Sequence, residues 1–408
     1  MTEPTTTPES GAAEAPRLRV LLAADTFPPD VNGAANFTER LAVGLAERGH
    51  DVHVLAPAPT RRHGTFLEEH GGRTLTVHRL HSTRWPLHDW LRFATPWTVK
   101  KHADELLDRI RPDVVHIQSH VVIGRGVTRS AAERGIRLVA TNHFMPENLI
   151  EHTGLPRAIW PLATRLAWDD AARTLRHMSA ITTPTQRAAD FLERSVHVSD
   201  VAAISCGIQA RDYVARDDRP AENKIVFVGR VTGEKQIDVL LRAMTRLDPA
   251  LGATLTVVGG GDLLEKLRQM TVDLGIAGRV TFAGYASDAE LRRTLTEATV
   301  FAMPSTAELQ SIASLEAMAS GLPIVVADAM ALPHLMDGDR NGRLFRPGDA
   351  DDLAAKLTEV LTLSDEDYRA MRRASLEVIE GHDIDRTVSV FESLYRGCPV
   401  AEAIRQGR

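Results

Sequence analysis

The sequence predicts an α/β protein built from two facing, doubly wound Rossmann-like domains. Short apolar runs that can form buried strands alternate with segments of helical periodicity along the chain after residue 16. Strands separated by helices form parallel sheets that are covered on both faces. The alternation breaks once, in a polar stretch over 210–223, and then restarts. A length of 408 residues also fits two domains of ordinary size.

The first half of the chain supplies one series of elements. Residues 1–16, rich in Thr, Pro, Glu and Ala, are expected to form a disordered tail. A helix is expected from about Asn36 to Arg48, with Asn36 as its N-cap, Glu39 three residues later and Gly49 at its end. The strand candidates are Leu18–Ala24, Val52–Ala56, Asp113–Ile117, Leu138–Thr141, Ala180–Thr183 and Val201–Ile204.

The second half repeats the pattern. Its strand candidates are Lys224–Gly229, Thr254–Val258, Arg279–Phe282, Val300–Met303 and Pro323–Ala327. Each is followed by a segment of helical periodicity. Ligands of such sheets lie at the carboxyl ends of the strands, so the two domains are expected to meet over a shared cleft.

The composition narrows the class of protein. A formal net charge of −6 speaks against general nucleic-acid binding, and two cysteines are too few for a disulfide framework or a thiolate metal site. No stretch approaches 18 uninterrupted apolar residues, and the N-terminus lacks the pattern of a secretory signal. These features predict a cytoplasmic location.

Two glutamates follow one strand of the second half. The strand ends at Ser305, Glu308 lies in the next loop, and a helix that begins near Ser311 contains Glu316. The first amides of a helix lack partners within it and bind anions, so a diphosphate is expected there. A carboxylate beside that diphosphate can accept hydrogen bonds from sugar hydroxyls. Alternatively, both glutamates are solvated side chains of a loop and a helix.

Two cations and three glycine-containing turns add to the same site. Arg230 and Lys235 flank a turn after Gly229, where paired cations can neutralise a diphosphate without a metal. Cations are unfavourable at helix starts unless an anion binds there, which argues against ordinary surface charge. Gly33 and Gly260, the latter within a run of three glycines, lie in two further strand-to-helix turns. Taken alone, neither turn is specific.

Together these motifs resemble the retaining glycosyltransferases of family four, which have the GT-B fold. The motifs occur in the family's order, and the resemblance extends from about Leu18 to Arg396. It implies an acceptor-binding domain over 17–209 and a nucleotide-sugar-binding domain over 210–381. It also implies that 382–408 contain a last helix that crosses back to the first domain.

The resemblance also implies a role for each site residue. Glu308 would contact hydroxyls of the donor sugar, and Glu316 the ribose of the nucleotide. Arg230 and Lys235 would hold the diphosphate, and His143, just after a strand, would face the reacting sugar. The predicted catalytic residues are His143, Glu308, Arg230 and Lys235. The predicted donor-binding residues are Gly33, Gly229, Arg230, Lys235, Gly260, Glu308, Gln310, Ser311, Ile312 and Glu316, and the acceptor-side residues are Asn32, His120 and His143.

Three positions depart from the family pattern. Leu309-Gln310-Ser311 replaces a common Gly-Phe-Gly, so contacts around the sugar are expected to differ. Gln236 replaces a glycine that commonly follows the lysine, and His382 stands where tryptophan is frequent.

No metal or other cofactor is predicted. His116, His120 and His143 lie at or just past strand ends, but they lack the spacing of known histidine metal motifs. One functional histidine with two packing histidines is favoured over a metal triad. Asp337-Gly-Asp339 resembles the metal motif of the other major glycosyltransferase fold, but its surroundings favour a solvated turn.

The acceptor is indicated by a basic segment, Arg61–His102. It carries eight Lys or Arg against three Asp or Glu, and all five tryptophans of the chain lie in the first domain. Cations interleaved with tryptophan are typical of a membrane interface. The alternative is a solvated loop whose tryptophans are buried in the core.

The sequence therefore predicts retaining transfer of a hexose from a UDP- or GDP-linked sugar to an acceptor hydroxyl, forming an α-glycosidic bond. The expected partners are the nucleotide-sugar donor, an acceptor that is either a lipid or a small soluble molecule, and an anionic membrane surface. The alternatives are a nucleotide-sugar epimerase on the same fold and a sugar-binding protein without catalysis.

Overall fold

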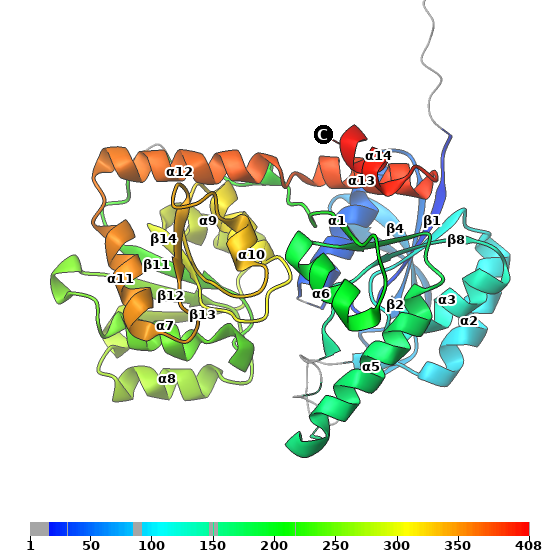
Figure 1. Cartoon of the computed structure of the whole chain (residues 1–408), viewed down its shortest axis with the longest axis horizontal. Coiled ribbons are helices and arrows are strands. Elements are labelled where there is room, and N and C mark those ends of the chain that lie inside the picture. Colours follow the sequence, from blue (N-terminus) through cyan, green and yellow to red (C-terminus); the bar gives the residue numbers. More distant parts are fainter. Residues whose placement is uncertain are drawn as a thin grey trace, which may run out of the picture.

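A computed structural model describes residues 16–30, 32–84, 92–146, 150, 154–216 and 218–407. Two α/β units lie side by side (Figure 1). Helices α12 (Asp365–Glu380) and α13 (Ile384–Tyr395) follow one another along the same edge, α12 on the second unit and α13 on the first. Most of the predicted tail, 1–15, lies outside the described residues. None of the described helices is long and apolar enough to span a bilayer.

The first domain is built on an eight-stranded sheet in the order β10-β9-β8-β7-β1-β2-β4-β3. Every neighbouring pair is parallel except β3 and β4. The strands are β1 (Arg19–Ala23), β2 (Asp51–Pro57), β3 (Gly64–His70), β4 (Arg73–Leu80), β7 (Val114–Ile117), β8 (Arg137–Thr141), β9 (Ala180–Thr183) and β10 (Ala202–Ala203). The helices are α1 (Gly33–Glu47), α2 (Pro96–Ile110), α3 (Ile123–Glu133), α5 (Trp160–Leu175) and α6 (Gln186–Val196).

The second domain is built on a six-stranded sheet, all parallel, in the order β13-β12-β11-β14-β15-β16. The strands are β11 (Lys224–Val228), β12 (Thr254–Val258), β13 (Val280–Gly284), β14 (Val300–Met303), β15 (Ile324–Ala327) and β16 (Gly342–Phe345). The helices are α7 (Ile237–Met244), α8 (Leu264–Asp273), α9 (Asp288–Glu297), α10 (Ile312–Ala319), α11 (Ala350–Leu361) and α12.

The strand order reverses once in each sheet, between β1 and β7 and between β11 and β14. Loops that follow the two central strands must diverge there, which leaves room for a ligand at the carboxyl ends of those strands. The predicted site residues Gly33, Arg230 and Glu308 all lie in or next to these loops. The two-domain α/β architecture that the sequence predicts is confirmed.

The C-terminal helices return to the first domain. Helix α13 packs on α1 through Val388, and a Cβ placed on Gly44 would lie 2.7 Å from a methyl group of that valine. Phe391 and Leu394 of α13 belong to the core that lies between α1 and the sheet. Helix α14 (Val400–Gln406) packs on α13. The last helices therefore join the two domains covalently and by packing (Figure 1).

The predicted start of the first helix is wrong. Helix α1 begins at Gly33 and its N-cap is Asn32, whose side chain accepts a hydrogen bond of 2.9 Å from the amide of Ala35. Asn36 lies inside the first turn. Both asparagines are favourable caps, and the periodicity alone does not distinguish two caps one turn apart.

The described part of the basic segment Arg61–His102 is not a solvated loop, which was the alternative to a membrane interface. Most of its described residues form β3, β4, the start of α2 and a small sheet of β5 (Ser82–Arg84) and β6 (Arg92–Ala94). The alternation of apolar and polar residues in β4 is not visible in the sequence, because a histidine and an arginine of this strand are buried. Arg79 is buried because Glu68 of β3 forms two hydrogen bonds with its guanidinium, at 2.9 and 2.5 Å. Strand β16 also escaped the prediction.

Candidate functional site

The β1–α1 loop is held by polar contacts at both of its ends. Asp25, at the end of β1, accepts hydrogen bonds from the hydroxyl of Ser119 and from the amide of Ile123, the latter at 2.8 Å. Burial raises the pKa of Asp25 above its usual value. Asn32 ends the loop as the α1 cap, and the following Gly33 is exposed. The first amides of α1 are thereby fixed in position at the junction between the domains.

His143 follows β8 and lies behind α1. Its Nε2 is 3.1 Å from Oε1 of Gln118, its Nδ1 is 3.9 Å from Sγ of Cys206, and its ring contacts that of Phe37 at 4.9 Å between centroids. Burial lowers the pKa of His143 to about 3, so the imidazole is neutral at physiological pH. A neutral imidazole can donate one hydrogen bond and accept another.

The other two histidines have different surroundings. His116 is fully buried between the hydroxyls of Tyr395 and Thr141, each at 2.7 Å, and is a packing residue. His120 packs near Trp168, and burial lowers its pKa to about 4. Among the described residues, no three His, Cys, Asp or Glu side chains are arranged to hold a metal ion.

In the second domain the β11–α7 turn carries the predicted cations. Arg230 contacts Oε1 of Glu234 at 3.1 Å, and Lys235 forms an ion pair with Glu308 of the β14–α10 loop. The amide of Thr306 donates to the carbonyl of Glu234 at 3.0 Å, so the two loops are tied together by backbone as well. Both cations thus lie at the point where the sheet order reverses.

The glycine run after β12 lets the backbone approach this turn. A Cβ on Gly259 would lie 2.0 Å from the carbonyl oxygen of Gly229, and one on Gly260 would lie 2.7 Å from the ring of Tyr285. The carbonyl of Gly260 accepts a hydrogen bond of 2.8 Å from Val231. A side chain at Gly259 would therefore displace the turn that carries Arg230, whereas one at Gly260 would displace the ring of Tyr285.

Helix α10 begins directly after the loop that carries Glu308. Its N-cap, Ser311, has φ 70° and ψ 81°, and its hydroxyl contacts that of Ser314 at 2.8 Å. Ile312 is the first residue of the helix. A Cβ on Gly33 would lie 3.9 Å from Cγ1 of Ile312, so the N-termini of α1 and α10 face each other across the domain junction.

Gln310 lies differently from its predicted role. Its Oε1 accepts a hydrogen bond of 2.8 Å from the amide of Cys206, and its Nε2 donates to the hydroxyl of Ser205 at 2.7 Å. His382 contacts the same hydroxyl through Nδ1 at 2.8 Å. The side chain of Gln310 therefore joins the two domains in this structure, and its contact with a donor stays a prediction.

Glu316 is buried on α10 and is paired with a residue that the sequence did not single out. Nη2 of Arg40, on α1, lies 2.9 Å from Oε1 of Glu316. Tyr213 neighbours the same carboxylate; burial, and then the charge of Glu316, raises its pKa. The seven-residue spacing from Gly33 to Arg40 places both on α1, but no motif indicated that this arginine reaches the other domain.

At two of the positions that depart from the family pattern, the backbone has a positive φ. Gln236 has φ 46° and Ser311 has φ 70°, and both values lie in the left-handed region that favours glycine. The common glycines at these positions are thus explained by the backbone. This chain keeps the same turns with side chains that are less favourable there.

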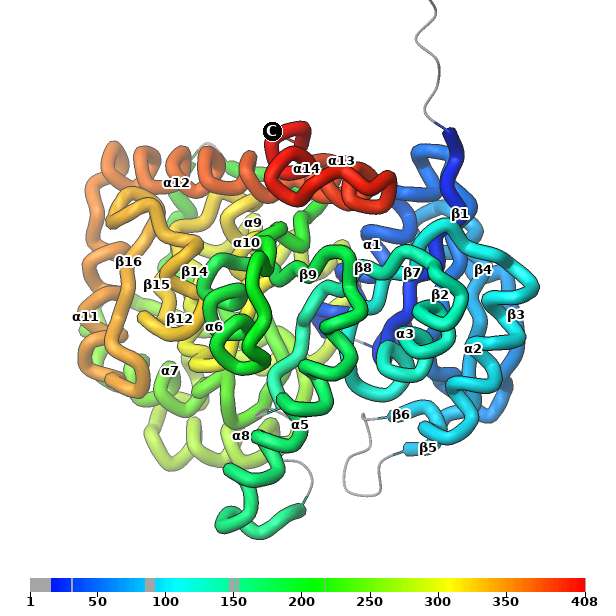
Figure 2. Tube along the Cα trace, turned by 45° about the vertical axis from the view of Figure 1, so that its right-hand side comes forward, coloured from blue at the N-terminus to red at the C-terminus, as the bar shows by residue number. Residues whose placement is uncertain are grey.

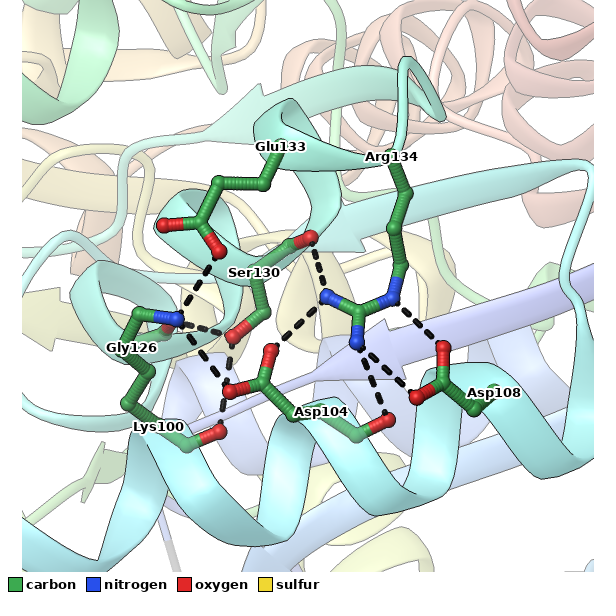
Figure 3. A network of polar contacts seen from close by, with 7 residues as sticks. All are labelled: Lys100, Asp104, Asp108, Gly126, Ser130, Glu133 and Arg134. Carbon is green, nitrogen blue, oxygen red and sulfur yellow. Dashed lines mark hydrogen bonds and ion pairs between the residues drawn. The ribbon is translucent and has the colours of Figure 1, made fainter.

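Ion pairs within the protein neutralise part of the positive charge of the basic segment. Lys100 forms ion pairs with Asp104 at 3.2 Å and with Glu133 at 2.9 Å, while Arg134 pairs with Asp104 and Asp108 (Figure 3). This network joins α2 to α3. Lys100 therefore serves packing between two helices rather than a free cationic surface.

The tryptophans divide between core and surface. Trp168 is buried, whereas Trp97 has 82% of its surface exposed. Trp85 and Trp90, the tryptophans in the middle of the basic segment, lie outside the described residues. Trp168 therefore fits the alternative in which the tryptophans are buried in the core, and Trp97 does not.

Chemically, the junction can bind an anion that carries hydroxyl groups. Two helix N-termini face each other, and each favours negative charge by about 0.3–1 kcal/mol. Arg230 and Lys235 add positive charge on one side, and Glu308 and Glu316 add hydroxyl acceptors. The site residues drawn from both halves of the sequence are thus brought to one place.

Comparison with known families agrees with this geometry. The profile described as "Glycosyl transferases group 1" matches residues 222–363, and the profile described as "Glycosyltransferase Family 4" matches residues 31–211. Two Rossmann-like domains with these matches define a glycosyltransferase of the GT-B fold. The chain belongs to the group 1 glycosyltransferases, the family four enzymes that the motifs resembled.

Individual relatives are moderately similar. An uncharacterized glycosyltransferase of Methanocaldococcus jannaschii is 32% identical over 46% of this chain and 47% of that protein, so the similarity spans about half of each. A GDP-mannose-dependent alpha-mannosyltransferase of Mycolicibacterium smegmatis is 28% identical over 80% of this chain and 84% of that protein. The sulfoquinovosyl transferase of Arabidopsis thaliana is 26% identical over 81% of this chain and 64% of that protein.

Solved structures show the same fold at low identity. Sucrose-phosphate synthase from Thermosynechococcus elongatus superposes with a TM-score of 0.76 at 17% identity, over 93% of this chain and 98% of that one. HepE from Anabaena, solved in complex with UDP-glucose, superposes with a TM-score of 0.71 at 17% identity, over 93% of this chain and 100% of that one.

Proposed function

We propose that this protein transfers a hexose from a nucleoside-diphosphate sugar to an acceptor hydroxyl with retention, forming an α-glycosidic bond. The observation that carries the proposal is the meeting of the α1 and α10 N-termini beside Lys235 and Arg230. A diphosphate bound there would be surrounded by backbone amides and two cations. Departure of the diphosphate builds negative charge where these groups can stabilise it.

The proposed mechanism is substitution on one face of the sugar without a metal ion. The acceptor hydroxyl would attack from the side on which the diphosphate leaves, and the leaving oxygen would take up the proton of that hydroxyl. Lys235 and Arg230 would stabilise the departing charge. Glu308, beside Lys235, would orient the sugar by accepting hydrogen bonds from its hydroxyls.

For the donor, GDP-mannose is the first compound to test. Relatives that align over about four fifths of this chain are named as GDP-mannose-dependent alpha-mannosyltransferases in Mycolicibacterium smegmatis and Corynebacterium glutamicum. Their names also support the α linkage. UDP-linked hexoses are the second set, because HepE, a structural neighbour, was solved with UDP-glucose.

For the acceptor, we propose a lipid at the cytoplasmic surface of a membrane. Helix α5 (Trp160–Leu175) projects from the first domain (Figures 1 and 2), and α5 and the turn before it carry exposed apolar side chains. Leu155 and Ile159 lie before the helix, and Leu162 and Leu166 lie in its first two turns. Arg157 and Arg165 lie between them in sequence and are exposed. Such a helix with cations suits an anionic interface. One relative, 26% identical, is named as a phosphatidylinositol dimannoside mannosyltransferase.

The test is a thermal-shift screen of GDP-, UDP- and ADP-sugars followed by product analysis with and without a lipid extract as acceptor. A true donor raises the melting temperature by mass action. We expect transfer that depends on acceptor and keeps the anomeric configuration. An epimer formed without acceptor would indicate an epimerase, and binding without any turnover would indicate a sugar-binding protein. An inverted product would refute retention.

A further inference from the structure

Arg40 and Glu316 form an ion pair between the two domains. Arg40 lies on α1 in the first domain, Glu316 on α10 in the second, and their Nη2 and Oε1 atoms are 2.9 Å apart. Both side chains are largely buried, with 22% and 9% exposed. A charge-assisted hydrogen bond in such surroundings is stronger than one at the surface.

The other terminal nitrogen of the same guanidinium is unpaired within the described part of the chain. Nη1 of Arg40 is buried and has no hydrogen-bond partner there. A buried donor without a partner is destabilising, so this nitrogen points to a ligand that accepts its hydrogen bond. Next to it lies the carboxylate of Glu316, which accepts hydrogen bonds only. Arginine and glutamate thus place a free donor beside an acceptor.

A donor beside an acceptor matches the chemistry of a hydroxyl group. A hydroxyl donates its proton to a carboxylate oxygen and accepts a hydrogen bond on its own oxygen. The vicinal hydroxyls of a ribose present this combination twice. The guanidinium also fixes the orientation of the Glu316 carboxylate, because the two side chains are joined by a hydrogen bond across the domain junction.

We propose that Arg40 is a positioning residue for the nucleotide, which holds the carboxylate of Glu316 in its orientation from the opposite domain. This inference rests on the proposed function and on the contact with the ribose that the family resemblance implies for Glu316. It adds that the first domain takes part in nucleotide binding through α1. Nucleotide affinity then depends on the two domains being together, and bound nucleotide favours that arrangement by reciprocity.

The matched control is Arg48, at the C-terminal end of the same helix. It caps the C-terminus of α1 and pairs with Glu392 of α13 at 3.1 Å, again an ion pair between segments far apart in sequence. Arg48→Met removes a comparable pair without touching Glu316. Any loss caused by general weakening of α1 appears in both variants.

The experiment measures the affinity of the full chain for GDP and UDP by calorimetry, with 2′,3′-dideoxy nucleotides as probes that lack the ribose hydroxyls. We expect Arg40→Met to weaken the ribonucleotide about tenfold or more, Arg40→Lys to weaken it less, and Arg48→Met to leave it within about twofold. In a Glu316→Gln background the effect of Arg40→Met should disappear. For the dideoxy probe, Arg40→Met should cause no further loss.

The outcomes separate this inference from the proposed function. Equal binding by wild type and both Arg40 variants would overturn the role of Arg40 alone. So would equal losses for ribonucleotide and dideoxy probe, or losses that add to those of Glu316→Gln. If Arg40→Met fails to fold, Arg40→Lys decides the same comparison. Wild-type protein that binds neither nucleotide would overturn the proposed function as well.

Discussion

Lys235 and Glu308 form an ion pair that joins the two loops at the switch point of the second sheet. Both side chains are largely buried, with 14% and 11% exposed. A lysine held in this way is oriented before any substrate arrives, which is the condition for efficient electrostatic stabilisation of a leaving group. The same contact fixes the carboxylate that is proposed to meet the sugar.

Lys235→Ala should therefore lower kcat by about 10²–10³, the usual effect of removing one preorganised group that stabilises developing charge. Arg230→Ala should act in the same direction. The measurement is steady-state transfer from the donor identified in the screen. The control is Arg242→Ala, which removes an exposed ion pair between Arg242 and Asp238 on α7. It should change kcat by less than about twofold.

Removal of divalent metal ions should leave this activity intact. With two cations and two helix N-termini proposed to stabilise the diphosphate, no further charge is required there. Transfer is measured in excess chelator and again after addition of magnesium or manganese. Loss in chelator with recovery on adding either metal would refute the metal-free mechanism.

The two glutamates should separate in their effects. Glu316→Gln should weaken binding of the bare nucleoside diphosphate by about tenfold, because the ribose hydroxyls lose a carboxylate acceptor. Glu308→Gln should leave that affinity within about twofold and lower the rate of sugar transfer. Calorimetry with the nucleotide and steady-state kinetics with the donor give the two readouts. Equal losses of nucleotide affinity would show that the assigned roles are wrong.

Strands proved more predictable than caps or polar pairs. All eleven strand candidates correspond to observed strands within two residues at each end, because buried parallel strands are nearly continuous apolar runs. Strand β4 was missed since His78 and Arg79 are buried in it, which sequence patterns treat as exposed. The pairing that makes burial possible, Arg79 with Glu68, is a property of two strands together.

The residues of the site also differ in whether the sequence could predict their positions. Residues directly after strands, such as Glu308 and Lys235, could be placed at one edge of a sheet from the chain order alone. Arg40 could not, because it lies in the middle of a helix and its partner is 276 residues away. The family resemblance assigns Gln310 to the donor; no sequence pattern indicated the contacts of its side chain with Cys206 and Ser205, and its contact with a donor stays a prediction.

Gln236→Gly should be neutral or stabilising. Gln236 has φ 46°, and its buried Oε1 has no hydrogen-bond partner among the described residues. Glycine removes both costs, at the expense of a more flexible unfolded chain. The free energy of unfolding in urea should rise or stay the same, by at most about 1 kcal/mol. Gln269→Gly, in the exposed middle of α8, is the control and should cost about 1 kcal/mol. A clear loss for Gln236→Gly would refute the backbone argument.

Stability should fall as the pH decreases from 6.5 to 5. Burial lowers the pKa of His120 and His382 to about 4 and that of His143 to about 3, against 6.5 for a free histidine. Below pH 6.5 the unfolded chain binds protons at these residues and the folded chain does not, so acid favours unfolding. Each contributes a slope of up to about 1.4 kcal/mol per pH unit. His70, whose pKa is raised chiefly by its hydrogen bond to Glu39, acts in the opposite sense.

The check is urea unfolding at pH 7, 6 and 5 for wild type and His382→Gln. The variant should show a shallower dependence on pH, by about one histidine's share. Equal slopes would mean that His382 has the same pKa in the folded and unfolded chains, which would contradict the lowering of its pKa by desolvation in the folded chain.

Membrane binding should depend on α5. The side chains of Leu162 and Leu166 are 60% and 56% exposed on the projecting half of this helix. Burial of exposed apolar side chains in an interface stabilises binding by about 25 cal/mol per Å², and cations on the same helix restrict it to anionic lipid.

Wild-type protein should therefore sediment with vesicles that contain phosphatidylserine and not with purely neutral vesicles. Binding should also weaken as the salt concentration rises, because interfacial charge is screened within about 8 Å at physiological ionic strength. Leu162→Gln with Leu166→Gln should remove most of this binding without unfolding the domain, since neither side chain is in the core. Val272→Gln, 61% exposed on α8 in the other domain, should leave binding unchanged. Transfer to a soluble acceptor should be the same in all three proteins. A wild-type protein that ignores anionic vesicles at low salt would refute the lipid surface and favour a soluble acceptor, while leaving the donor chemistry untouched.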